Sequence, residues 1–190
     1  MKENSTLRQL SYLDVPMKAK LRFIFQLGAV VLTGLLCGVF LAFALDVSPA
    51  LQRLDAATYI QTQQQFNQTV SNLGFALLFF GAMLFPFLTA GMAAWQSRRR
   101  MAMYWLLVAL LHFVGVYWVS IATNIPLHQD ILAWNPAAPP ADWQTLRDTW
   151  TTGNWVRTIA EAVCFIGALT LLVLREQLAA QPRYVMRQQN

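Results

Sequence analysis

Long apolar runs without a charged side chain are the feature of this sequence that most restricts its fold. Hydrophobic residues make up 56% of the 190 residues and charged residues only 12%, which is too few charges to cover a soluble domain of this size. A bilayer core about 30 Å thick is crossed by roughly 20 helical residues. The runs predict four membrane spans, near residues 23–45, 70–95, 101–123 and 154–174.

These spans predict an all-α fold, an integral membrane four-helix bundle that forms a single domain over residues 1–190. Outer loops are expected at 46–69 and 124–153. Ser48 and Pro49 are typical of a helix start, and Asp55 is a candidate cap for the next helix. No breaker follows Asp55 before Gly74, so we expect helix two to begin well outside the membrane and to run straight into it.

The basic residues predict the orientation of the bundle. Arg53, Arg147 and Arg157 are the basic residues expected on the outer side. The other eleven lie before span one, between spans two and three, or after span four: Lys2, Arg8, Lys18, Lys20, Arg22, Arg98, Arg99, Arg100, Arg175, Arg183 and Arg187. The positive-inside rule therefore predicts a multi-pass protein of the bacterial inner (cytoplasmic) membrane, with both termini cytoplasmic. The net charge of +5 reflects this topology, and no nucleic-acid partner is expected.

The N-terminal segment and the two cysteines are both interpreted as structural. The first apolar run is longer than the core of a typical signal peptide, which favours an uncleaved anchor. Pro16 should separate the lead-in of residues 1–20 from span one. Cys37 and Cys164 both fall inside spans, where we expect small buried apolar residues and no disulfide.

Two polar segments near the outer side are the candidate binding site. The first, TNIPLHQDILAW at 123–134, offers Asn124, His128 and Trp134, and Pro126 is expected to stop helix three. The second, at the start of span four, offers Asn154, Trp155 and Arg157. We expect the first segment to lie over the second as an outer loop with defined structure.

Ionisable residues within spans are functional candidates because charge is costly in lipid. His112 and Glu161 are such residues, and each also has a structural reading, as an interhelical hydrogen bond or a buried pair. Arg157, His112 or a substrate are the partners open to Glu161. His112 and His128 are too far apart along the chain to share one metal ion readily, so no metal site is assigned, although either histidine could be a ligand.

The glutamine-rich outer part of helix two is either a solvated surface or the polar rim of a cavity. Tyr59 and Gln63 are its candidate binding residues, because they recur at helical spacing with Phe66 and Val70.

Three segments carry a resemblance to a known family: SPALQRLDAATY at 48–59, NIPLH at 124–128 and NWVRT at 154–158. Together they resemble the anthrone oxygenase-like family of small four-helix membrane proteins, over about residues 24–175. Many relatives have asparagine where this chain has His128, which adds acid–base or ligand capacity here. The resemblance implies oxidation of an activated methylene of a polycyclic anthrone to a quinone by molecular oxygen, without a dedicated organic cofactor.

The implied mechanism assigns the base to His128 or His112, with Glu161 as a further catalytic candidate. Asn124, Arg157 and Trp155 would hold the enolate oxygen. The alternative function is a non-catalytic membrane module that binds a quinone, haem, metal ion or other hydrophobic ligand, or that serves as a subunit of a larger membrane complex. The expected partners are the lipid bilayer and a hydrophobic small molecule, and homo-oligomerisation is left open.

Overall fold

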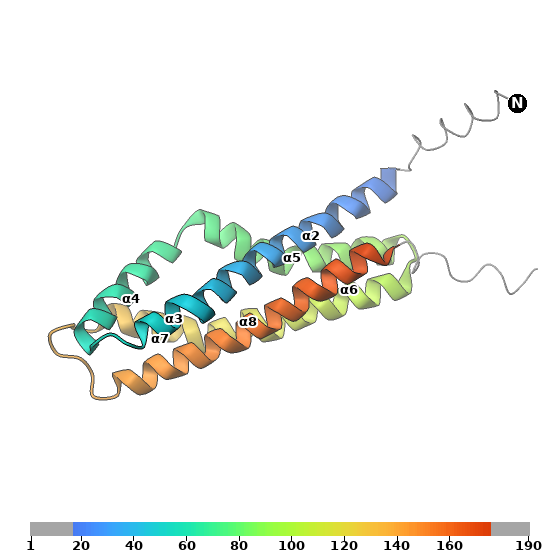
Figure 1. The fold of residues 1–190 in the computed structure, drawn as a ribbon. Coiled ribbons are helices and arrows are strands. Elements are labelled where there is room, and N and C mark those ends of the chain that lie inside the picture. The colour runs from blue at the N-terminus through green and yellow to red at the C-terminus, as the bar shows by residue number, and fades with distance from the viewer. Residues whose placement is uncertain (1–16, 176–190) are drawn as a thin grey trace, which may run out of the picture.

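Four long helical segments make up the computed structural model, which describes residues 17–175 (Figure 1). The first comprises α2 (Met17–Ala42), η1 (Phe43–Val47) and α3 (Ser48–Leu51). The second is α5 (Leu73–Trp95), preceded by α4 (Ala56–Val70). The third comprises α6 (Arg99–His112), η2 (Phe113–Trp118), η3 (Ser120–Asn124) and α7 (Ile125–Ala133). The fourth is α8 (Trp143–Val173). Each segment has a helix long and apolar enough to cross a bilayer, which confirms the predicted all-α membrane bundle.

Small residues allow the helices to approach closely inside the bundle. α2 packs against α5 and α8, and α6 packs between α5 and α8. A Cβ atom at Gly34 of α2 would lie 2.8 Å from the ring of Phe165 on α8. Such contacts favour helix association in lipid, where packing replaces the hydrophobic effect.

The two ends of the bundle differ in charge. Residue 17, residue 175 and the turn between α5 and α6 lie at the same end, and α4 and α7 lie at the opposite end (Figure 1). We call the first the basic end, because Lys18, Lys20, Arg22, Arg98, Arg99, Arg100 and Arg175 lie there. The Arg22 guanidinium donates to the Gln96 side chain at this end. Lys2, Arg8, Pro16, Arg183 and Arg187 lie outside the described residues.

The expectation of one continuous helix two is wrong, because the chain breaks at Ser71 and Asn72. Asn72 has an extended backbone, and its side chain accepts a hydrogen bond of 2.9 Å from the Phe75 amide, so it caps α5. The Ser71 hydroxyl donates to the Asn67 carbonyl at 3.1 Å. Asp55 does cap α4, as predicted, by accepting from the Thr58 amide.

The expected stop of helix three at Asn124 is also wrong. The segment continues through Pro126 to Ala133, so His128 and Asp130 lie on a helix and the connection to α8 is short. The backbone is π-helical in η2 and η3, and the Ile125 amide donates to the Ser120 carbonyl, five residues back. Pro126 follows in the first turn of α7, where a missing amide donor costs little.

The expected outer loops 46–69 and 124–153 are therefore mostly helical. η1 carries the first segment past Ala42, and Ser48 lies within that segment without a side-chain capping bond. The last part of the expected loop 124–153 is the beginning of α8, and Asp142 before it makes no side-chain capping bond. Much of the polar sequence thus extends the bundle beyond the predicted spans.

Candidate functional site

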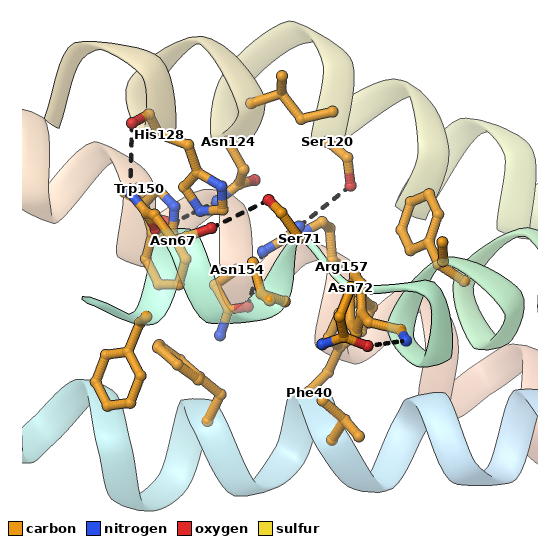
Figure 2. A pocket seen from close by; sticks show the side chains of 18 of the residues that line it. Phe40, Asn67, Ser71, Asn72, Ser120, Asn124, His128, Trp150, Asn154 and Arg157 are labelled. Atoms are coloured by element: carbon orange, nitrogen blue, oxygen red, sulfur yellow. Dashed lines mark hydrogen bonds between the residues drawn. The ribbon is translucent and has the colours of Figure 1, made fainter. Parts of the chain in front are cut away.

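A cavity of about 450 Å³ lies in the half of the bundle that carries α4 and α7. α2, η1, α4, α5, η3, α7 and α8 all contribute to its wall (Figure 2). Its size falls within the range of roughly 300–1,000 Å³ typical of small-molecule sites. The lining residues are Val39, Phe40, Phe43, Gln63, Phe66, Asn67, Val70, Ser71, Asn72, Phe75, Ala76, Phe79, Phe80, Ser120, Asn124, Ile125, His128, Trp150, Asn154 and Arg157.

Phenylalanine rings form much of the apolar wall. They come from the first segment and from α4 and α5: Phe40, Phe43, Phe66, Phe75, Phe79 and Phe80. Several rings contact one another, including Phe43 with Phe66, whose centroids are 5.8 Å apart in an edge-to-face arrangement. Such a wall favours flat apolar ligands, which can stack on ring faces or meet ring edges.

Arg157 brings a positive charge to this apolar wall. Its side chain is only 7% exposed, and no described carboxylate forms an ion pair with it. The guanidinium donates to Ser120 Oγ at 3.2 Å and to Asn154 Oδ1 at 3.0 Å (Figure 2). Its Cζ also lies 5.0 Å from the ring centroid of Phe40. A buried cation held only by neutral groups is suited to bind an anion in the cavity.

Two asparagine amides lie beside Arg157. Asn124 donates through Nδ2 to the Trp150 carbonyl at 3.0 Å, and its Oδ1 has no hydrogen-bond partner among the described residues. Asn154 Nδ2 is likewise buried and unpartnered there. Gly153 provides the space for the first amide, since a Cβ atom at Gly153 would lie 2.7 Å from Asn124 Oδ1. Buried polar atoms in native proteins are normally paired, so these atoms indicate a ligand-binding wall.

His128 adds a titratable group to the polar wall. Its ring stacks on Trp150, with centroids 5.7 Å apart, and its carbonyl accepts from Asn67 Nδ2 at 3.3 Å. Nε2 of His128 is buried and has no hydrogen-bond partner among residues 17–175. Gln63 Oε1 is also buried and has no hydrogen-bond partner among these residues. The wall thus combines a cation, several side-chain amides and an imidazole.

The cavity opens on the side of the bundle, and its exposed lining residues include side chains of α2, α4, α5 and α7. Val39 is 43% exposed, Phe66 38% and Phe80 51%. Ser71 and Asn72, at the break between α4 and α5, are exposed as well. The rim of the cavity therefore combines exposed apolar side chains with the polar residues at the break between α4 and α5.

Three predicted binding residues lie away from the cavity lining. Tyr59 is buried against Trp143, with ring centroids 5.5 Å apart, and burial raises the pKa of its phenol to about 12. Trp134 packs against the same cluster, and its carbonyl accepts from Gln64. Trp155 is 38% exposed on α8. The aromatic cluster of Tyr59, Trp134 and Trp143 therefore stabilises the α4 end of the bundle.

His112 and Glu161 face each other inside the bundle and do not belong to the cavity lining. Both are fully buried, and His112 Nδ1 lies 2.7 Å from Glu161 Oε2. Of the partners open to Glu161, the structure places His112 against it, while Arg157 is directed to Ser120 and Asn154. Phe79 contacts both regions, since it lines the cavity and its ring centroid is 6.5 Å from that of His112.

Sequence reasoning missed Asn67, Ser120 and Trp150 as parts of this wall. Asn67 is one helical turn after Gln63, and its Oδ1 accepts from Gln63 Nε2. Ser120 lies within the apolar span predicted over 101–123, and Trp150 lies within the outer loop predicted over 124–153. Helical spacing could have identified Asn67, and the i,i+4 register of α8 relates Trp150 to Asn154.

The comparison with protein families places most of this site in a known family. The family described as anthrone oxygenase matches residues 75–167, a range that contains Ser120, Asn124, His128, Asn154 and Arg157. No curated protein and no solved structure matches the chain. This match over residues 75–167 confirms the resemblance to the anthrone oxygenase family that the sequence indicates.

Proposed function

We propose that this membrane protein oxidises a polycyclic aromatic substrate with an acidic C–H, using molecular oxygen, in the cavity beside Arg157. The observation that carries the proposal is the Arg157 guanidinium, which is buried without a carboxylate partner among the described residues and faces a wall of phenylalanine rings. An aromatic ketone that ionises to an enolate matches both features, because its rings are apolar and its oxygen becomes negative only when the proton leaves.

His128 is the base in this proposal. It lines the cavity with an unpartnered, buried Nε2, whereas His112 does not line it. Proton transfer from the substrate carbon to His128 leaves the electron pair delocalised onto the ketone oxygen. Stacking on Trp150 would hold the imidazole in place during the transfer.

Arg157 and Asn154 are the groups suited to hold the enolate oxygen. Arg157 already has its guanidinium fixed by Ser120 and by Asn154 Oδ1, so it needs little reorganisation when charge develops. Asn154 Nδ2 offers a further donor. Fixed donors of this kind lower the barrier most in a site from which water is excluded.

Oxygen then completes a balanced reaction. The carbanion forms a C–O bond with O₂, which gives a substrate hydroperoxide after protonation. Loss of the second hydrogen from that carbon breaks the O–O bond and releases water. The methylene becomes a carbonyl in a four-electron oxidation, with one oxygen atom in the product and one in water.

The test is quinone formation and oxygen uptake by the purified protein in lipid nanodiscs with an anthrone substrate. His128→Ala should lower kcat by about 10²- to 10⁴-fold, the contribution of a general base. Arg157→Gln should lower kcat/KM by about 10²-fold or more, the effect of losing an oxyanion donor. Protein-free nanodiscs give the rate of spontaneous oxidation.

Cys37→Ala is the control for both variants, since it alters a buried side chain outside the cavity lining. If the wild-type protein does not exceed the protein-free rate, the proposal is wrong. It also fails if His128→Ala and Arg157→Gln both keep the wild-type rate. Substrate binding without turnover would instead support the non-catalytic ligand-binding module.

We also propose that the basic end faces the cytoplasm of a bacterial inner membrane, so the cavity lies toward the outer leaflet. The support is the concentration of lysine and arginine at that end, according to the positive-inside rule. Labelling of a single cysteine introduced at Ala137, in the short connection before α8, should occur from the outer side of intact spheroplasts. Labelling only after lysis would reverse the orientation.

A further inference from the structure

A cluster of three potential metal ligands lies in the core, separate from the cavity lining. His112 on α6 faces Glu161 and Cys164 on α8, and all three side chains are buried. One ligand atom from each residue lies within 4.8 Å of the other two. The cluster joins nitrogen, oxygen and sulfur donors from two neighbouring helices.

Ordinary packing leaves much of the bonding capacity of these groups unused. His112 Nε2 and Glu161 Oε1 have no hydrogen-bond partner among the described residues. The Cys164 thiol has one weak contact, 3.6 Å from its Sγ to the Val108 carbonyl. Arg157, one turn before Glu161, donates to Ser120 and Asn154 instead of neutralising the carboxylate. A buried carboxylate with so few partners is costly unless a proton or a cation compensates it.

The spacing of the ligands suits a shared ion. Glu161 and Cys164 are three residues apart, so they project from the same face of α8 toward His112. Around a tetrahedral ion with bonds of about 2.0–2.3 Å, ligand atoms lie roughly 3.3–3.8 Å apart. The His112–Glu161 contact of 2.7 Å would open slightly and the thiol would move inward, changes that side-chain rotation can supply.

Charge and donor type together select the class of ion. A carboxylate and a thiolate carry two negative charges, which a divalent cation neutralises in this apolar surrounding. A mixed set of imidazole, carboxylate and thiolate favours a borderline transition-metal ion, whereas Mg²⁺ and Ca²⁺ prefer oxygen ligands alone. Three protein ligands leave one coordination position open, as in catalytic zinc sites.

We propose that His112, Glu161 and Cys164 bind one divalent transition-metal ion of the Zn²⁺ type. The inference rests on the core cluster and does not depend on the proposed oxidation in the cavity. Phe79 contacts both regions, as its ring lines the cavity and approaches His112. The ion would therefore lie one side-chain layer beneath the cavity and could influence it through position and charge.

The test is metal binding by the purified full chain, measured without an activity assay. The protein is loaded with Zn²⁺ or Co²⁺, passed over a desalting column and analysed for metal content. Wild-type protein should retain about one ion per chain, and its Co²⁺ form should show the intense absorption of a thiolate-to-cobalt charge transfer. Cys164→Ala should lose this absorption and should bind either ion at least about 10-fold more weakly. His112→Gln should show the same loss of affinity.

Cys37→Ala is the matched control, because Cys37 is also a buried free cysteine in a span but does not belong to the cluster. It should keep the ion and the charge-transfer absorption. Circular dichroism checks that each variant is folded, and the Co²⁺ spectrum of the wild-type protein gives a result even if His112→Gln fails to fold. The proposal is overturned if folded wild-type protein retains no ion, if bound Co²⁺ shows no thiolate absorption, or if Cys164→Ala binds as tightly as wild type.

Discussion

Replacement of Gly153 by alanine should have two opposite effects on stability, a gain in helix propensity and a clash with the Asn124 side chain, which a control variant can separate. Within a helix, alanine is more favourable than glycine by about 0.8–1.0 kcal/mol. At Gly153 the added methyl would lie 2.7 Å from Asn124 Oδ1 and 3.2 Å from Thr123 Cγ2. The buried Asn124 amide would have to move, and its bond to the Trp150 carbonyl would be lost. Leaving such a buried group unpaired costs about 1–3 kcal/mol.

The matched control is Gly91→Ala on α5, where a Cβ atom would meet nothing within 4 Å. Gly91→Ala should therefore gain the full difference in helix propensity between alanine and glycine. The free energies of unfolding of the two variants should therefore differ by about 1–3 kcal/mol, the cost of the lost bond, with Gly153→Ala the less stable. Urea unfolding followed by circular dichroism in detergent micelles measures this difference. Binding of an aromatic ligand should weaken in Gly153→Ala alone.

The reasoning would be refuted if Gly153→Ala were as stable as Gly91→Ala and bound the ligand as wild type does. Such a result would mean that Asn124 can rotate away without loss, and that its contact with Gly153 does not shape the polar wall.

Three further predictions concern the α4 end of the bundle. Burial raises the pKa of Tyr59 to about 12. Because this folded-state pKa exceeds the unfolded value of about 10, the stability that the buried neutral phenol contributes is complete below pH 10 and is lost as pH rises toward 12. The difference between the ultraviolet titrations of wild type and Tyr59→Phe should therefore have its midpoint near 12. The hydrogen bonds from Thr58 hold the pKa of Asp55 below its usual value, so the stabilisation that Asp55 gives α4 is present at neutral pH and is lost on acidification through that pKa. Asp55→Asn keeps an accepting oxygen but has no carboxyl group to protonate. The stability of this variant should therefore depend less on acidic pH than that of wild type. Asn72→Ala should reduce the free energy of unfolding by about 1 kcal/mol through loss of the α5 cap, whereas Asn72→Asp should retain most of it, and a urea titration distinguishes the two.

The apolar runs sufficed to predict the four-helix bundle, because a bilayer allows few alternatives to a helix of the required length. The predictions of where helices begin and end are wrong at residues whose effect depends on the surrounding backbone. Pro126 reads as a helix stop, but the π-helical turns before it place its missing donor at the start of α7. Ser71 and Asn72 lie within a run of polar residues, so a cap could not be distinguished from a helix face.

The candidate site was predictable by residue type and less so by contact. Asn124, His128, Asn154 and Arg157 were selected as unusual polar residues near a span, and they do meet at one cavity. The partner of Glu161 could not be chosen from sequence, because Arg157 and His112 both lay within reach. Tertiary packing decides that choice through Ser120, whose hydroxyl helps to draw the guanidinium toward the cavity.

The opening on the flank of the bundle has a consequence for how substrate supply should be measured. If the proposed substrate enters past Val39 on α2 and Phe80 on α5, it arrives from the acyl chains, where hydrophobic aromatics accumulate by partition. Its effective concentration is then a mole fraction in the lipid and not an amount per volume of buffer. Adding inert lipid at constant total substrate should dilute the substrate in two dimensions and slow turnover, although nothing in the aqueous phase has changed.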